Sequence, residues 1–522
     1  MSVDSSGVRS SELVAALSLA TDLGMGQPME HQQRVCILAV RLGRAFGLGE
    51  PELTEVYHLA LLRWIGCTSH AFELSAWFDD EIAAQARAAT FELQRPADLL
   101  RDLVLYAGAG RSPLRRIHTV VSALAAGPGS VADLLLASCE VGRRLAVQLG
   151  FGAEVGEALG YVFERWDGRG PAGARGETIP LAVRVVQVAG DAETFRRIGG
   201  LGAAREVVRE RMGAAYDPTV AELFCRECGA LCADLEVGEP WEAVLAAEPG
   251  GPRVLTEAEL DSGLLAVADF ADLKSPCTAG HSRGVAHLAA EAARAAGLPE
   301  ADVVALYRAG LLHDVGRVGV PSGIWEKPGP LSEAEWERVR LHPYYTERVL
   351  SRVRALAQVG GLAALHHERM DGSGYPHRVP AAMLPLAARI LAAADVYQAM
   401  TQPRPHRQAL GAARAAAELR QEARDGRLEP RAVDAVLTAA GAAPQTARRN
   451  PVDLTPREVE VLRLVARGLS MKKMAQRLGI SRKTVDHHIQ HIYAKAGVSS
   501  RAAAALFAIQ HGFLDPPDAP SA

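Results

Sequence analysis

Histidine and aspartate side chains of the kind that bind metal ions gather in one part of this sequence. The adjacent histidines His366 and His367 open the stretch "HHERMDGSGYP", and the pair His313 and Asp314 lies in "LLHDVGRVGVP". Imidazole suits transition metals, and carboxylates bridge hard or borderline cations. Each of these side chains falls on or beside an apolar helical pattern, so we expect them to converge on one buried metal site. The full candidate set is His281, His313, Asp314, His342, His366, His367 and Asp395.

The order of these motifs resembles the HD-GYP family of metal-dependent phosphohydrolases. The resemblance covers about Leu264 to Arg424 and rests on several spaced elements in the correct order. It implies a helical domain that binds two divalent metal ions, iron or manganese, and hydrolyses cyclic di-GMP. It also implies that the seven candidates are the metal ligands, that His313 and Asp314 are catalytic, and that Asp314 bridges the two ions.

These residue types suit the hydrolysis of a phosphodiester. The ester is anionic and reacts slowly with water, and a pair of cations would polarise its phosphoryl oxygen and lower the pKa of a water molecule. Arg317 stands where family members usually have lysine, and its guanidinium is a further catalytic and substrate-binding candidate for the phosphate. The alternative is that Arg317 is a solvent-facing helix residue.

The loop after the paired histidines contains the substrate-binding candidates Gly372, Gly374, Tyr375 and Pro376. The two glycines permit a tight turn near the metals. Tyr375 would then be placed to stack on a guanine, as aromatic side chains do with exposed bases. Two alternatives stay open: the Tyr375 ring packs on its own domain, or the loop docks a partner protein, as it does in the family.

Four further positions depart from the family pattern, and none of them is a predicted ligand. Cys277 stands where members with three metals carry glutamate, which favours a two-metal site. Thr346 replaces a glycine, Gln398 an aspartate and His406 a tyrosine. These changes put the rate of catalysis in doubt without excluding it.

The N-terminal half contains a second copy of the pattern without its ligands. The stretch from Glu164 to Asp191 matches the one from Glu368 to Asp395, and the stretch at His31 matches the one at His281. In this register the side chains at ligand positions are those of Arg63, Trp64, Ser138, Val162 and Phe163, which cannot hold a pair of cations. We expect a degenerate, non-catalytic domain that either packs against the active copy or senses a ligand in the old cleft.

The C-terminal segment has the pattern of a helix-turn-helix. Thr455 is an N-cap with Pro456 at the first helical position and Glu458 completing a capping box. A short helix from Met471 to Leu478 and a tight turn precede a second helix that begins at Arg482. In the second helix we expect Val485, Ile489 and Ile492 to face inward.

This segment resembles the LuxR-type (GerE-like) DNA-binding domain, which inserts the second helix into the major groove. The implied contacts to bases and phosphates are Lys472, Lys473, Arg482, Lys483, Thr484, Val485, His488 and Arg501. Asp486 stands where the family often has a base, so the target site is expected to be unusual. The alternative is a helical protein–protein module whose basic residues are merely solvated.

The helices that must position these residues follow from the bulk properties of the chain. Its 522 residues are too many for one core, and helical apolar spacing recurs almost everywhere, so the fold class should be all-α. We predict a degenerate domain at 1–250, a phosphohydrolase domain at 255–440, a linker at 441–453 and a helix-turn-helix domain at 454–522.

The net charge of −4 excludes wholesale coating of nucleic acid. The seven scattered cysteines indicate a reducing compartment. With neither a signal peptide nor a membrane span evident, we expect a cytoplasmic protein.

The sequence therefore predicts a transcriptional regulator whose cyclic di-GMP phosphodiesterase domain is coupled to DNA binding. One alternative is a transcription factor whose metal domain senses a ligand without turnover. Another is a phosphohydrolase acting on a different nucleotide. By analogy with LuxR-type domains, we expect a homodimer.

Overall fold

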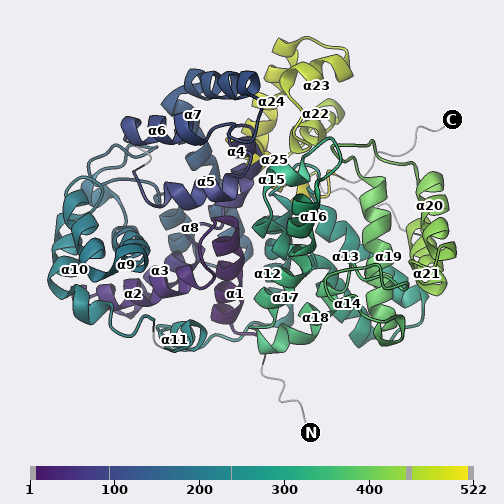
Figure 1. The fold of residues 1–522 in the computed structure, drawn as a ribbon, viewed down its shortest axis with the longest axis horizontal. Coiled ribbons are helices and arrows are strands. Elements are labelled where there is room, and N and C mark those ends of the chain that lie inside the picture. The colour runs from purple at the N-terminus through teal and green to yellow at the C-terminus, as the bar shows by residue number, and fades with distance from the viewer. Residues whose placement is uncertain (1–6, 93–94, 237, 443–449, 515–522) are drawn as a thin grey trace, which may run out of the picture. The chain divides into compact units, whose positions relative to one another are not determined.

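A computed structural model of the chain describes residues 7–92, 95–236, 238–442 and 450–514 (Figure 1). These residues contain α- and 3₁₀-helices and isolated β-bridges but no β-strand, so the all-α prediction is confirmed. They form two compact units. The first comprises the chain up to Ala266 with Gly316–Gly323 and Arg348–Gln358, and the second comprises Val267–Val315, Ile324–Glu347 and the chain from Val359 onward. Most of the predicted linker at 441–453 lies outside the described residues.

The first unit is built mainly from the N-terminal helices. Helix α7 is one long element broken at Gly127, whose φ of 73° is not helical. The helices are α1 (Ser10–Gly24), α2 (His31–Phe46), α3 (Glu50–Leu62), α4 (Ala71–Ser75), α5 (Glu81–Ala88), α6 (Pro96–Tyr106), α7 (Pro113–Gln148), α8 (Ala153–Leu159), α9 (Leu181–Arg211), α10 (Pro218–Leu231) and α11 (Pro240–Ala246), with 3₁₀ turns η1 (Cys67–His70) and η2 (Gly176–Thr178).

The helices that follow carry the predicted metal ligands, and α12, α17 and α18 extend across the boundaries between the units. They are α12 (Glu257–Asp272), α13 (His281–Ala295), α14 (Glu300–Leu312), α15 (Ser322–Trp325), α16 (Glu333–Arg340), α17 (His342–Leu350), α18 (Ala357–Ala364), α19 (Leu386–Thr401), α20 (Ala412–Arg424) and α21 (Pro430–Ala442). Three 3₁₀ turns separate them: η3 (Val315–Gly319), η4 (Arg354–Leu356) and η5 (Ala381–Met383).

The same helix arrangement occurs in both units. Helix α13 packs on α14 and α19, just as α2 packs on α3 and α9. The residue that precedes α13 and the residue that precedes α2 also have the same backbone conformation. Gly280 before α13 and Glu30 before α2 are both left-handed, with φ of 74° and 75°. A glutamate in this conformation is uncommon, so its retention indicates that the turn itself is required. The internal repeat predicted from the sequence is therefore present as a repeated scaffold.

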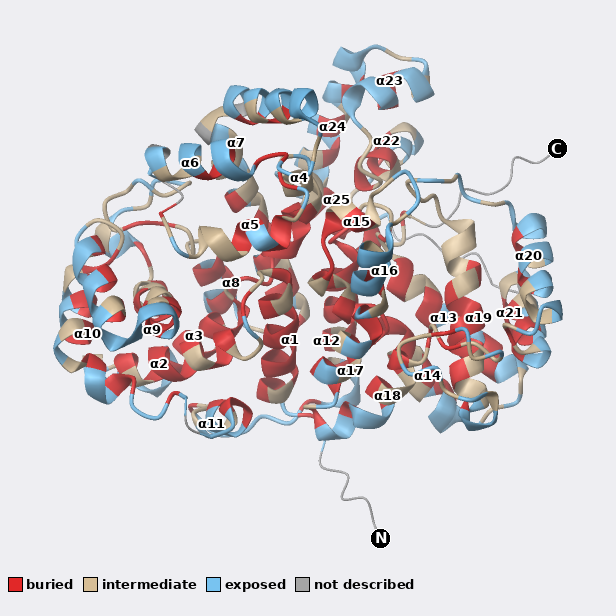
Figure 2. Cartoon of the chain, viewed as in Figure 1, coloured by how far each residue is buried: buried red, intermediate tan, exposed pale blue. Residues whose placement is uncertain are grey.

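The buried side chains lie where alanine, valine and leucine recur at helical spacing. Figure 2 shows α13 and α19 with many buried residues, whereas α20 is mostly exposed. Small residues allow close packing: a Cβ at Gly310 on α14 would lie 2.5 Å from the Cα of Ala286 on α13. This close approach brings the end of α14 beside α13, and it is there that two of the predicted ligands lie.

The C-terminal helices of the second unit pack on one another. They are α22 (Pro456–Ala466), α23 (Met471–Leu478), α24 (Arg482–Ala496) and α25 (Arg501–Gln510). Helix α22 packs on α24 and α25, and α23 packs on α24. Gly479, with φ of 64°, closes the turn between α23 and α24, as expected of a helix-turn-helix.

No single helix in the described ranges is long and apolar enough to cross a membrane. The two arms of α7, Pro113–Ala125 and Gly129–Gln148, meet that description only when they are taken together across a 76° bend.

Candidate metal centre and DNA-binding helices

The predicted ligands lie at helix ends and on one inner helix face of the second unit. His281 and His342 are the first residues of α13 and α17, and His313 directly follows α14. A side chain at a helix end can point along the axis of the bundle, where it does not compete with the packing of the helix faces. The remaining ligands are Asp314 beside His313, His366 and His367 after α18, and Asp395 within α19.

These seven side chains meet in a largely buried cluster. His281, His313, Asp314, His342, His366 and Asp395 are each at most 6% exposed, whereas the side chain of His367 is 21% exposed. Three overlapping sets bring their ligand atoms within 4.8 Å of one another: His342, His366 and His367; His281, His313 and Asp395; and His313, Asp314 and His366. The cluster therefore has a closed interior and an accessible edge at His367.

Backbone carbonyls fix the protonation of three imidazoles. A carbonyl oxygen only accepts hydrogen bonds, so the Nδ1 facing it must donate, and in a neutral ring the Nε2 is then left as a bare acceptor. The three bonds run from His313 Nδ1 to Gly310 O (2.8 Å), from His342 Nδ1 to Val339 O (2.6 Å) and from His366 Nδ1 to Ala363 O (2.8 Å).

The bare nitrogens face one another instead of facing donors. His342 Nε2 lies 3.1 Å from His366 Nε2, and His281 Nε2 lies 3.1 Å from a carboxylate oxygen of Asp395. The buried Nε2 of His313 has no hydrogen-bond partner in the described part of the chain. Lone pairs held this close repel one another unless a cation lies among them. The donor set therefore fits divalent metal ions.

The Asp314 carboxylate faces both sides of the cluster. Its Oδ1 lies 3.5 Å from His342 Nε2 and 3.7 Å from His366 Nε2. Its Oδ2 lies 3.5 Å from His313 Nε2 and 4.0 Å from His281 Nε2. Each oxygen is thus directed to a different pair of imidazoles, which is the arrangement that a bridging ligand requires.

Burial sets the charge state of the ligands. It lowers the pKa of His366 to about 3, with His313 and His342 acting in the same direction. It also places the pKa of His367 well below the ordinary value. Burial alone would raise the pKa of Asp395, but opposing interactions, the largest of them with His281, place that pKa well below its ordinary value. At neutral pH His366 and His367 are therefore neutral and Asp395 is ionised, which is the state that binds a metal.

Several residues that support the ligands carry no motif of their own. Gln402 Oε1 accepts a hydrogen bond from His281 Nδ1 at 2.9 Å and so orients that ring. Asp272 on α12 accepts hydrogen bonds from the backbone nitrogen and the hydroxyl of Ser282, which fixes the first turn of α13. Burial raises the pKa of Asp272 to about 7. The signal that could have identified this residue is the internal repeat, because Asp22 makes the matching bond to the backbone nitrogen of Gln32 at 3.2 Å.

The glycine loop after the histidines is held by a buried glutamate. The carboxylate of Glu368 accepts backbone hydrogen bonds from His377, Arg378 and Val379 at 2.8 to 3.0 Å. Gly372 has φ of 75°, and a Cβ at Gly374 would lie 2.5 Å from the Cα of Glu368.

Tyr375 lies at the accessible edge of the cluster. Its ring is half-buried, with its centroid 4.7 Å from that of His367. Pro376, which follows it, is likewise half-buried. The tight turn predicted from the glycines is present, and Tyr375 lies next to a predicted ligand, where a base or a partner side chain could reach it.

The positions that depart from the family pattern differ in their surroundings. The Thr346 hydroxyl donates to the backbone carbonyl of His313 at 2.9 Å, so it braces a ligand. Gln398 fills the space beside Gly284 on α13. Cys277 lies with its Sγ 3.7 Å from Glu326 Oε2, and His406 is exposed. Arg317 is half-buried in η3, directly after the His-Asp pair.

The helix-turn-helix begins with the predicted capping box. The Thr455 side chain accepts from the backbone of Glu458, and the Glu458 carboxylate accepts from the backbone of Thr455 at 2.8 Å. Helices α23 and α24 match the predicted limits, and Val485, Ile489 and Ile492 are all buried. The side chains of the proposed interface that stand exposed are Lys472, Lys473, Arg482, Lys483 and Thr484, with His488 half-buried.

Two predicted DNA contacts are used within the domain itself. Val485 has 0% exposure because it packs in the hydrophobic core, so we exclude its side chain from the proposed interface. Arg501 is half-buried and donates to the backbone carbonyl of Leu469 at 2.9 Å, which holds the segment before α23. A part of its guanidinium therefore has a structural role.

Family models match two parts of the chain. Residues 266–432 match the family described as "HD domain", and residues 452–508 match "Bacterial regulatory proteins, luxR family". The first match contains all seven candidate ligands, and the second contains helices α22 to α24 and most of α25.

Known proteins resemble the chain over different lengths. The 3'3'-cGAMP-specific phosphodiesterase 3 of Vibrio cholerae is 32% identical over 415 residues, which cover 78% of this chain and 90% of that protein. The cyclic di-GMP phosphodiesterase response regulator RpfG of Xanthomonas campestris is 42% identical over 156 residues, which cover 29% of this chain and 41% of that protein. The crystal structure of a cyclic GMP-AMP-specific phosphodiesterase of V. cholerae, V-cGAP3, matches with a TM-score of 0.58 and 28% identity. That match covers 84% of this chain and 99% of the solved one.

Proposed function

Because the chain belongs to the HD-GYP family of cyclic dinucleotide phosphodiesterases and ends in a LuxR-type domain, we propose that it hydrolyses a cyclic dinucleotide and couples this ligand to DNA binding. The observation that carries the catalytic proposal is the contact between His342 Nε2 and His366 Nε2 at 3.1 Å. Both rings donate through Nδ1 to backbone carbonyls, so in the neutral rings neither Nε2 carries a proton that could form a hydrogen bond between them. The regulator would act in the cytoplasm as a dimer.

The seven ligands would hold two divalent ions, iron or manganese, with Asp314 shared between them. When bound, such ions supply Lewis acidity toward the phosphoryl oxygen and a water of lowered pKa. The protein contributes orientation and exclusion of water. The imidazoles that donate through Nδ1 to backbone carbonyls keep Nε2 directed inward, and burial of the cluster leaves His367 as the edge from which a phosphodiester can approach.

Residues around this edge would position the substrate. Tyr375 is next to His367, so its ring is suited to stack on one base while the linked phosphate reaches the metals. Gly372 and Gly374 keep the loop close to the backbone of Glu368, and Pro376 continues it. Arg317 is proposed to offer its guanidinium to the phosphate, in the role usually filled by lysine.

Turnover by the full-length protein tests the proposal. Protein loaded with Mn²⁺ or Fe²⁺ should convert a cyclic dinucleotide to its linear product, and the product should disappear in His313→Ala and Asp314→Ala. Cyclic di-GMP and 3'3'-cGAMP should be compared through kcat/KM, because they share the diester and differ in one base. Metal-loaded protein that binds neither compound and hydrolyses neither would contradict the proposal.

A second candidate function is ligand sensing without turnover. It is favoured by Arg317 and Gln398, which stand where the family has lysine and aspartate. Protein that contains metal and binds the nucleotide but releases no linear product would select this function. Arg317→Lys would then be the informative variant, since restored turnover would identify the arginine as the cause of the loss.

The DNA-binding proposal rests on the exposed residues of α23 and α24. Lys472 and Lys473 are placed to pair with phosphates, and Arg482, Lys483, Thr484 and His488 to approach the major groove. Lys483→Ala should weaken binding to a DNA selected from a random library by the full-length protein. If Lys483 contacts a phosphate, the slope of log affinity against log salt should fall by about 1, while hydrolysis stays unchanged. Unaltered DNA affinity would exclude Lys483 from the interface.

A further inference from the structure

The first unit contains a cavity at the place that matches the metal cluster of the second. It has a volume of about 370 Å³, within the range of small-molecule sites. Its lining includes five residues that stand where the second copy has His313, Asp314, His366, His367 and Asp395. These five residues are Arg63, Trp64, Val162, Phe163 and Asp191. The old cleft has therefore persisted as a space and has not collapsed into an ordinary core.

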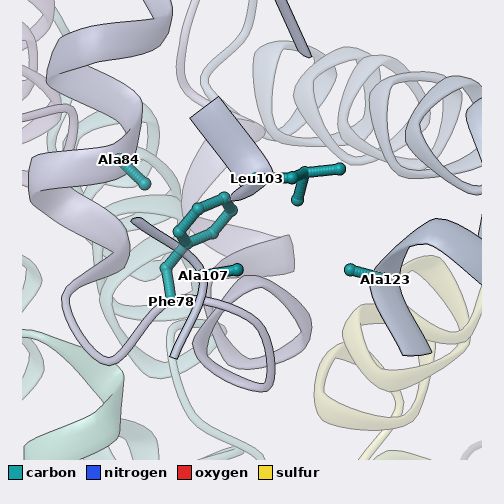
Figure 3. Close-up of a cluster of buried hydrophobic side chains, with 5 residues drawn as sticks. All are labelled: Phe78, Ala84, Leu103, Ala107 and Ala123. Carbon is teal, nitrogen blue, oxygen red and sulfur yellow. The ribbon is translucent and has the colours of Figure 1, made fainter. Parts of the chain in front are cut away.

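Most of the cavity wall is apolar. Helices α5, α6 and α7 and the segment before α5 contribute a cluster of buried side chains, with Phe78 among Ala84, Leu103 and Ala123 (Figure 3). These four side chains also line the cavity. Trp77, Leu134, Leu135 and Phe163 extend the apolar lining. Such a wall suits a ligand with an aromatic or aliphatic portion, and it offers few hydrogen-bond partners to a ligand that is polar throughout.

Arg63 supplies the polar end. Its Nη1 is buried and has no hydrogen-bond partner within the described residues, and its guanidinium lies over the Trp64 ring at 4.5 Å. Burial lowers the pKa of Arg63, although the charge of Asp191 opposes the shift. A buried cation without a full set of acceptors is costly and is expected where a ligand completes the set.

A glycine on α9 leaves space for the side chain of Arg63. A Cβ at Gly190 would lie 1.7 Å from Nη1 of Arg63, so a larger residue there would displace the guanidinium from this position. The matching residue in the second copy is Ala394, where no arginine needs the space. Glycine inside α9 costs helix stability relative to alanine, which indicates that the site is built around the guanidinium.

The other arginines that line the cavity already have acidic partners. Arg211 donates to Asp191 at 2.5 Å, and Tyr216 donates to the same carboxylate. Arg165 is paired with Glu92 and with Asp167. Arg63 has no carboxylate within ion-pair distance in the described chain, so the cavity keeps one uncompensated cation.

We propose that this cavity binds a small organic anion, with its single acid group on Arg63 and its apolar body against the aromatic wall. The guanidinium would do there what metal ions would do in the second copy: it presents positive charge to an anion, but it is covalently attached and needs no ion. A fork of donors suits a carboxylate, sulfonate or phosphate. The site is separate from the proposed phosphodiesterase centre and does not depend on its activity.

Two dyes with closely similar aromatic bodies test the proposal on the full-length protein. 8-Anilinonaphthalene-1-sulfonate carries an acid group, and N-phenyl-1-naphthylamine lacks it. We expect the sulfonate to bind with 1:1 stoichiometry and enhanced fluorescence, unaffected by EDTA. Arg63→Met should weaken its binding at least tenfold and leave the amine unchanged or tighter, whereas Arg63→Lys should restore part of the affinity. Arg44→Met, which changes an exposed arginine on α2, is the matched control.

Stability separates this role from a structural one. If Arg63 serves a ligand, Arg63→Met should leave the melting temperature of the free protein unchanged or raise it, because an uncompensated buried charge is removed. Equal binding of the sulfonate by wild type and Arg63→Met, equal affinity for both dyes, or no 1:1 binding would each overturn the proposal. So would a large fall in melting temperature in Arg63→Met, because it would assign the arginine to the core.

Discussion

The cluster around His313 and the cavity around Arg63 occupy matching places in two copies of one helical scaffold. Both copies keep the residues that shape the backbone. Glu368 and Glu164 each accept backbone hydrogen bonds from the following loop, and Gly372 and Gly168 have φ of 75° and 79°. The copies differ at five of the seven positions that would bind metal. The scaffold is therefore held by residues outside the ligand set, so the ligands could be exchanged without loss of the fold.

The charge at the two centres is supplied in different ways. The second copy collects unprotonated imidazole nitrogens and carboxylates, which are incomplete without cations. In the first copy the positive charge is on the guanidinium of Arg63, and the buried His31 contacts the carboxylate of Glu193. A chelator or a change of ligand should therefore affect one copy and not the other, and each prediction below tests this separation.

The largest expected effect is on turnover. His313→Ala removes a predicted ligand, and Asp314→Asn removes the charge of the carboxylate proposed to be shared by both ions, so in each variant hydrolysis of the cyclic dinucleotide should fall at least about a thousandfold. The matched change in the first copy, Arg63→Ala, should leave kcat within about twofold. Steady-state measurement of linear product checks both, and a comparable loss in Arg63→Ala would break the comparison.

Removal of metal should loosen the second copy alone. A ligand present at 100 to 1,000 times its Kd stabilises the folded state by about 2.7 to 4.1 kcal/mol. Hydrogen exchange of the EDTA-treated protein should therefore rise in α13, α14 and α18, and it should stay the same in α2, α3 and α8. Restored protection on adding Mn²⁺ is the control. An equal rise in hydrogen exchange in α2, α3 and α8 would show that metal removal also affects the first copy.

The two glutamates that hold the loops should matter equally to stability. Glu368→Gln and Glu164→Gln each weaken two or three charge-assisted hydrogen bonds to backbone, so each should lower the free energy of unfolding by about 2 kcal/mol. Only Glu368→Gln should also reduce turnover. Denaturant unfolding measures the first effect, with exposed Glu333→Gln as the control. A neutral outcome for Glu164→Gln would mean that its loop is held by other contacts.

The smallest expected effect is the pH dependence that His58 contributes to the stability of the first copy. Burial lowers the pKa of His58 on α3 to about 4, and the matching residue of the second copy is Arg308, which does not titrate in this range. Because the folded pKa lies below the unfolded value of 6.5, the unfolded state binds the proton more strongly. Stability should fall as pH declines from 6.5 toward 4, by up to about 1.4 kcal/mol per pH unit. His58→Leu should flatten this slope, and an unchanged slope would assign it to other groups.

Much of the fold follows from local signals in the sequence. Thr455, Pro456 and Glu458 form a cap whose bonds span three residues, and Val485, Ile489 and Ile492 recur at helical spacing. Such features depend on neighbours along the chain, so the limits of α23 and α24 could be predicted. The same periodicity shows why Val485 was a poor candidate for a DNA contact, since a valine on the inner face is buried before it can reach a base.

The contents of the sites depend on contacts between distant segments. Seven ligands could be proposed because histidine and aspartate are distinctive, but the carbonyls of Gly310, Val339 and Ala363 that fix their protons carry no motif. The cavity around Arg63 depends on how α5, α6 and α7 pack, and Phe78 or Leu103 looks like any core residue in sequence. Asp272 could have been found only by aligning the two copies.

Anomalous diffraction from crystals of the full-length protein grown with Mn²⁺ tests the central claim most directly. Two ions should lie among His281, His313, Asp314, His342, His366, His367 and Asp395, and none within the cavity lined by Arg63. An empty cluster in protein saturated with metal, or an ion beside Arg63, would contradict this claim.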